Sequence, residues 1–130
     1  MTDRRITLFG GSGFLGRPLA SRLAAHGWTV RVASRHPRQQ DAPAADSRVV
    51  AVIADLGEED QVRRAMAGVE AVINLVGIAR EQDASFEAVH VAGAARVARL
   101  AAAAGVKRLL HISALGIAED APSAAVRTKA

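Results

Sequence analysis

Apolar and polar positions along this chain form two alternating kinds of segment. Short apolar runs predict five strands, at residues 4–9, 28–34, 48–54, 71–76 and 107–112. The run at 48–54 is nearly continuous, which is typical of a strand buried on both faces of a parallel sheet. Helical patterns lie between the runs, at residues 14–26, 58–68, 86–104 and from 121 onward.

Local signals support the first two helices. In the first helix, leucines recur every four residues with alanines beside them, at Leu15, Leu19, Leu23, Ala20 and Ala24. The second begins with three acidic residues and ends with two basic ones, which matches the helix dipole at both ends: Glu58, Glu59, Asp60, Arg63 and Arg64. We therefore interpret the acidic run as helix-end electrostatics and expect no metal site.

The regular alternation of strands and helices predicts a doubly wound α/β fold. Right-handed crossovers should build a parallel sheet of about five strands in the order 3-2-1-4-5, covered on both faces. The 130 residues suit one domain. Ligands of such sheets bind outside the carboxyl ends of the strands, where the order reverses between the first and fourth strands.

A glycine-rich turn lies at that point. Gly10, Gly13 and Gly16 form a GxxGxxG pattern between the first strand and the first helix. The first glycine permits a positive φ, the second leaves room for a pyrophosphate, and the third lets helix and strand touch. We expect this loop to bind the phosphates of a dinucleotide through residues Gly10, Gly11, Ser12, Gly13, Phe14, Leu15 and Gly16.

Other polar residues follow the neighbouring strands. Ser34 and Arg35 end the second strand, and no carboxylate follows until Asp41. An acidic residue at this position would bind the ribose of NAD, whereas an arginine would pair with the 2′-phosphate of NADP, so NADP is favoured over NAD. Asp55, Asn74 to Gly77 and Ser113 fall at the ends of the third, fourth and fifth strands.

Composition excludes several classes of protein. There is no cysteine, which fits a reducing cytosol, and we expect a cytoplasmic protein. We find no apolar run long enough to cross a bilayer. The net charge is +4, but the arginines are scattered and aromatic residues are scarce, so we expect no nucleic-acid binding.

These motifs resemble a short-chain dehydrogenase/reductase of the extended or atypical kind. They are the glycine loop, Asp55-Leu56, the strand end at 74–77 and the segment His111 to Gly116. Within that superfamily the chain is similar to bacterial, epimerase-like relatives of the Rossmann-folded accessory subunit of NADH:ubiquinone oxidoreductase (complex I). The resemblance covers residues 4–130. It implies a Rossmann domain, nicotinamide dinucleotide binding, and a link to complex I or to quinones.

The resemblance also implies residue roles. Arg35 would approach the adenosine ribose or its phosphate, and Asp55 and Leu56 would border the adenine. Ser113 matches the active-site hydroxyl, and Lys129 matches the lysine of the YxxxK pair. The nicotinamide side would be lined by Asn74, Leu75, Val76 and Gly77.

The catalytic tyrosine is absent. Ala125 stands four residues before Lys129, and the chain has no tyrosine. The usual general acid is therefore missing, which predicts impaired catalysis. His111 could act as a substitute, but we expect it to be a core residue or one behind the site. The alternative is an active oxidoreductase, or a nucleotide-sugar epimerase or dehydratase, whose substrate lobe lies beyond residue 130.

Relative to that family the chain is truncated at its C-terminus. We expect it to stop inside the helix that carries Lys129 and to lack the substrate lobe. Two explanations are open: a fragment of a longer protein, which we favour, or a module whose exposed apolar surface is covered by a second copy in a homodimer.

Overall fold

The computed structural model describes residues 4–10, 15–35, 37, 48–76 and 91–112. The strands are β1 (Arg4–Phe9), β2 (Trp28–Ser34), β3 (Val49–Ile53), β4 (Ala71–Asn74) and β5 (Arg108–His111). The helices are α1 (Gly16–Ala25), α2 (Glu59–Ala65) and α3 (Ala94–Ala103). Each of these elements lies within a predicted one. The predicted helix from 121, and the part of the predicted 86–104 helix before residue 91, fall outside the described residues.

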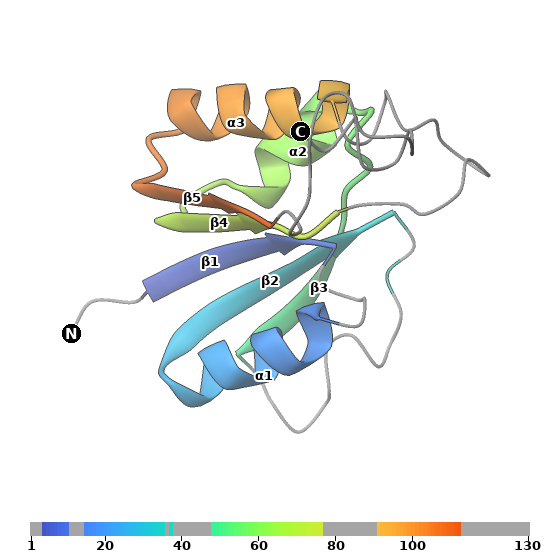
Figure 1. Cartoon of the computed structure of the whole chain (residues 1–130). Helices are drawn as coiled ribbons and strands as arrows, with labels where there is room; N and C mark the ends of the chain where they lie inside the picture. Colours follow the sequence, from blue (N-terminus) through green and yellow to red (C-terminus); the bar gives the residue numbers. More distant parts are fainter. Residues whose placement is uncertain (1–3, 11–14, 36, 38–47, 77–90, 113–130) are drawn as a thin grey trace.

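The five strands form one parallel sheet in the order β3-β2-β1-β4-β5, which confirms the predicted topology. At its carboxyl end β1 places Phe9 between Ala33 of β2 and Asn74 of β4. Helix α1 covers one face of the sheet, and α2 and α3 cover the other (Figure 1). None of the described helices is both long and apolar enough to cross a membrane.

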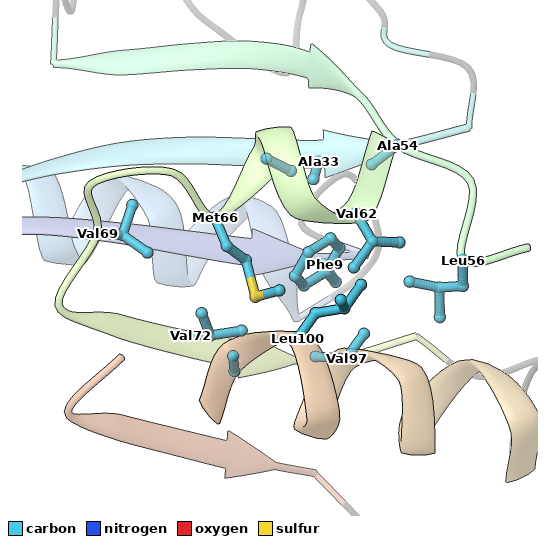
Figure 2. Packing of buried hydrophobic residues seen from close by; sticks show 12 residues of the cluster. Phe9, Ala33, Ala54, Leu56, Val62, Met66, Val69, Val72, Val97 and Leu100 are labelled. Carbon is cyan, nitrogen blue, oxygen red and sulfur yellow. The ribbon is translucent and has the colours of Figure 1, made fainter. Parts of the chain in front are cut away.

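The face under α2 and α3 contains the larger core cluster, in which the ring of Phe9 is central (Figure 2). Helix α3 contributes Val97, Leu100 and Ala101, whose i, i+3, i+4 spacing places them on one side of the helix. Met66 and Val62 bring α2 and the turn after it onto the same ring. This packing fixes both helices against the carboxyl half of β1.

The opposite face packs against α1 through small residues. Ala20 and Ala24 are buried in one cluster with Ile6 and Leu8 of β1 and Val30 and Val32 of β2, whereas Leu19 and Leu23 are only partly buried. Leu15, which the sequence pattern grouped with these leucines, is 55% exposed. The contact stripe of α1 is therefore centred on the alanines, because small side chains let a helix approach a sheet closely.

Two strand side chains cap the C-terminal end of α2. Thr7 Oγ1 donates a hydrogen bond of 2.6 Å to the carbonyl of Ala65, and Arg31 Nη1 donates one of 3.1 Å to the same oxygen. The last carbonyls of a helix lack partners within the helix and carry a partial negative charge. Burial lowers the pKa of the Arg31 guanidinium, and the nearby charge of Arg5 adds to that effect.

The edge strand β5 corrects one prediction. All four of its residues are exposed, including His111, which we expected in the core or behind the site. Placement in the core was wrong because β5 pairs on one side with β4, and no other described strand covers its second edge. Leu110 is likewise 56% exposed.

Candidate functional site

Gly10 shapes the centre of the carboxyl edge. Its φ of +80° lies in the left-handed region, as predicted for the first glycine of the loop. A Cβ atom there would lie 3.0 Å from the backbone nitrogen of Val76 and 3.1 Å from the carbonyl carbon of Leu75. The glycine is therefore required twice, by its backbone conformation and by the closeness of the segment that follows β4.

Hydrogen bonds join the ends of the three central strands. The Gly10 N–H donates to the carbonyl of Ala33 at 2.9 Å, and the Leu75 N–H donates to that of Phe9 at 2.8 Å. Beyond Gly10 the chain re-enters the described structure at Leu15, and α1 begins at the buried Gly16. The predicted phosphate-binding residues Gly11, Ser12, Gly13 and Phe14 lie outside the described residues.

The end of β2 contains a buried hydroxyl without a partner. Ser34 Oγ has no hydrogen-bond partner within the described part of the chain. The Ser34 backbone is in place, because its carbonyl accepts a 2.8 Å hydrogen bond from the Ala54 N–H of the neighbouring segment. Arg35 follows directly and is half-buried. Ser34 and Arg35, two of the predicted cofactor-binding residues, thus lie at the carboxyl edge.

After β3 the chain makes a tight turn. Asp55 Oδ1 accepts the Gly57 N–H at 2.8 Å, and the Asp55 carbonyl accepts the Glu58 N–H at 2.9 Å. The side chain of Leu56 is buried in the core cluster beside α3 (Figure 2). Of the two predicted adenine neighbours, Asp55 offers a carboxylate and Leu56 can offer its backbone.

Asn74 holds the end of β4. Its side chain is 3% exposed, and its Oδ1 accepts the Val76 N–H at 3.0 Å. Its backbone carbonyl accepts the Ile112 N–H from the segment after β5. Leu75 and Val76 are partly buried against opposite core clusters. Asn74 therefore holds the backbone of Val76, one of the residues predicted to line the nicotinamide side, and joins it to the segment after β5. Gly77, Ser113, Ala125 and Lys129 lie outside the described residues.

The acidic start of α2 is occupied by ion pairs. Glu59 pairs with Arg63 on its own helix and with Arg99 on α3, and Asp60 also pairs with Arg63 at 2.8 Å. The hydrogen bond from Arg99 lowers the pKa of the Glu59 carboxyl, and the charges of both arginines add to this effect. The interpretation of the acidic run as helix-end electrostatics is confirmed, and Arg99 of α3 supplies an additional positive charge.

A model of the family described as NAD(P)H-binding matches residues 10–129. The chain belongs to the NAD(P)H-binding family. It is 35% identical over 130 residues to the mitochondrial NADH dehydrogenase [ubiquinone] 1 alpha subcomplex subunit 9 of Arabidopsis thaliana, covering 95% of this chain and 32% of that protein. It is 34% identical over 129 residues to the ceramide reductase of Caulobacter vibrioides, covering 94% and 39%.

Solved structures agree with this membership. A short-chain dehydrogenase/reductase superfamily protein from Agrobacterium tumefaciens, solved with bound NAD, superposes with a TM-score of 0.75 at 27% identity, covering 97% of this chain and 42% of that one. Uronate dehydrogenase from the same organism gives a TM-score of 0.73 at 27% identity, covering 88% and 42%. The chain spans about a third of the length of the curated relatives it matches.

Two residues near the carboxyl edge of the sheet were missed by the sequence reasoning. Gln61 Oε1 of α2 accepts the backbone N–H of Asp55 at 2.9 Å, and Arg96 Nη1 of α3 donates to the carbonyl of Leu56. Helical periodicity places Gln61 and Arg96 on helices but gives no partner for them, since each bond depends on how a helix packs against the turn after β3.

Proposed function

We propose that the chain binds the nicotinamide dinucleotide of its family at the carboxyl edge of the sheet, with the pyrophosphate against residues 10–16. The observation that carries the proposal is Gly10, whose positive φ and contact with the end of β4 leave no room for a side chain. The chain turns there, where the strand order reverses, and returns at Gly16 as the start of α1. Such a helix start offers unpaired N–H groups to an anion.

We further propose a preference for NADP over NAD. Ser34 ends β2 and Arg35 follows it, where a carboxylate would be expected for binding the ribose of NAD. The unpartnered Ser34 Oγ supports this, because a buried hydroxyl without a hydrogen bond is costly and a ligand oxygen at this edge would satisfy it. The guanidinium of Arg35, the next residue along the chain, suits a phosphate, since arginine pairs with phosphate through two parallel hydrogen bonds.

Cofactor titration tests both proposals. A ligand bound only by the native state at a hundred times its Kd stabilises that state by about 2.7 kcal/mol, or roughly 10 °C in Tm for a domain of this size. We expect NADPH to reach this shift at lower concentration than NADH. Arg35→Gln should weaken NADPH binding by about tenfold and leave NADH nearly unchanged. Arg64→Gln, at an exposed residue on α2, is the matched control.

No shift with either cofactor would refute dinucleotide binding. Equal affinities, or a preference for NADH, would refute only the NADP proposal. If Arg35→Gln and Arg64→Gln gave the same ratio of NADPH to NADH affinity, Arg35 would not be the residue that binds the 2′-phosphate.

We also propose that catalysis is impaired. The first candidate function is therefore an accessory role like that of the complex I subunits. When bound, the dinucleotide would supply or accept a hydride. Ala125 has no group to exchange the accompanying proton, whereas Ser113 could still bind a substrate oxygen. An active oxidoreductase or epimerase is the second candidate, because reductases and dehydrogenases are among the similar proteins. Hydride transfer to quinones, carbonyls and nucleotide sugars by the wild type would favour the second candidate, whereas activity only after Ala125→Tyr would favour the first.

A further inference from the structure

The turn after β3 is held by side chains from two different helices. Gln61 of α2 accepts the N–H of Asp55 at 2.9 Å, and Arg96 of α3 donates to the carbonyl of Leu56. Within the turn, Asp55 Oδ1 accepts the N–H of Gly57 at 2.8 Å. Both peptide groups that flank the Asp55–Leu56 link are therefore fixed by helix side chains, and the one after Leu56 is also fixed from within the turn.

Arg96 differs from its neighbour on the same helix. Arg99, three residues further along α3, pairs with the carboxylate of Glu59 and its side chain is 60% exposed. Arg96 is only partly exposed and directs its guanidinium to a neutral carbonyl 40 residues away in sequence. A hydrogen bond from a charged donor is stronger than one between neutral groups. This bond therefore restrains the backbone of Leu56.

The restraint determines which groups remain for a ligand. The Asp55 Oδ1 and the Leu56 carbonyl are engaged, so the turn can present the second carboxylate oxygen of Asp55 and the N–H of Leu56. The turn therefore offers a ligand one hydrogen-bond acceptor beside one hydrogen-bond donor. The outer edge of adenine carries the complementary pair, an amino group beside a ring nitrogen with a lone pair.

We propose that Gln61 and Arg96 are positioning residues for the adenine end of the dinucleotide. They hold Asp55 and Leu56 at the angle and spacing that adenine requires, and they do not themselves touch the ligand. The inference rests on the proposed binding of a nicotinamide dinucleotide. Loss of either restraint should reduce discrimination between purines, because a loose turn can adapt to the wrong hydrogen-bonding pattern.

The test compares NADPH with its hypoxanthine analogue, in which a carbonyl oxygen replaces the adenine amino group and the ring nitrogen carries a proton. We expect the wild type to bind NADPH about tenfold more tightly than the analogue. That ratio should fall to about two or less in Arg96→Met and in Gln61→Leu. Gln61→Glu keeps an acceptor oxygen and should restore the ratio. Arg99→Met, which removes a guanidinium from the same helix, should leave it unchanged.

The ratio is measured within each variant, so a general loss of stability does not move it. An undiminished ratio in both Arg96→Met and Gln61→Leu would overturn the inference, even if their Tm values fell. A wild-type ratio near one, with NADPH still bound, would overturn the inference and leave dinucleotide binding intact. A wild type that binds neither compound would overturn both.

Discussion

Replacing Gly10 with alanine separates two reasons for a glycine at the carboxyl edge, because the chain contains a matched control. Gly10 has a φ of +80° and Gly105, after α3, has a φ of +76°. A Cβ on Gly10 would lie 3.0 Å from the Val76 nitrogen, whereas one on Gly105 would meet nothing within 4 Å. Both substitutions place alanine in the left-handed region, but only Gly10→Ala also meets backbone.

The expected costs follow from these two terms. Left-handed backbone costs a residue with a Cβ about 1–2 kcal/mol relative to glycine, which applies to both variants. The contact at Gly10 adds about 1–3 kcal/mol of overpacking. The backbone atoms it meets cannot move easily, since the Val76 N–H is bonded to Asn74 and that of Leu75 to Phe9. We therefore expect losses of about 1–2 kcal/mol for Gly105→Ala and about 2–5 kcal/mol for Gly10→Ala.

Thermal unfolding and dinucleotide titration provide the assay. At about 4 °C per kcal/mol for a domain of this size, Tm should fall by roughly 4–8 °C in Gly105→Ala and roughly 8–20 °C in Gly10→Ala. Below its Tm, Gly105→Ala should bind NADPH like the wild type, and Gly10→Ala should bind it at least about tenfold more weakly. Equal Tm losses would show that the backbone of Leu75 and Val76 moves away from the added Cβ at little cost. Unchanged binding by Gly10→Ala would refute its place in the phosphate site.

Two further predictions concern stability. Thr7→Val removes one of the two donors to the Ala65 carbonyl and should cost about 1 kcal/mol, or about 4 °C in Tm. Adding Arg31→Met leaves that carbonyl without its side-chain donors, so a double-mutant cycle should show a loss greater than the sum; strict additivity would contradict this shared cap. Arg99 lowers the pKa of Glu59 in the folded state, so the Glu59 carboxylate stabilises the fold above its unfolded-state pKa. This stabilisation is lost as pH falls through the lower folded-state pKa, and the Tm difference between wild type and Glu59→Gln should shrink between about pH 5 and pH 3.

The order of the strands could be predicted because its signals are local. Each apolar run is bounded by polar residues or glycine, and helical segments connect the runs, so right-handed crossovers leave few arrangements. The left-handed conformation of Gly10 was predictable for the same reason, since a strand that leads directly into a helix must turn sharply there. Asp55 and Asn74 could be placed at the carboxyl edge because each lies where a predicted strand ends.

What the sequence did not reveal depends on packing between distant segments. Whether Leu15 or Ala20 faces the sheet depends on how closely α1 approaches it, and a four-residue spacing of leucines alone does not decide this. The exposure of His111 depends on which strand lies at the edge, and the pattern of β5 resembles that of a buried strand. The restraint of Leu56 by Arg96 joins residues 40 apart, and no local signal marks such a pair.

The arginines of this basic chain have different roles that depend on where they lie in the fold. Arg31 and Arg48 donate to the carbonyls of Ala65 and Ala24, at the C-terminal ends of α2 and α1, where the helix dipole is negative. Each of these helices runs antiparallel to the strands, so its C-terminal end points toward the amino edge of the sheet, and the charges of Arg31 and Arg48 complement these helix ends within the fold. Arg35 follows β2 at the carboxyl edge, where helices begin and their dipoles are positive. A cation at that edge adds to a potential that attracts anions, which is why we propose Arg35, and not Arg31 or Arg48, as the partner of the 2′-phosphate of NADP.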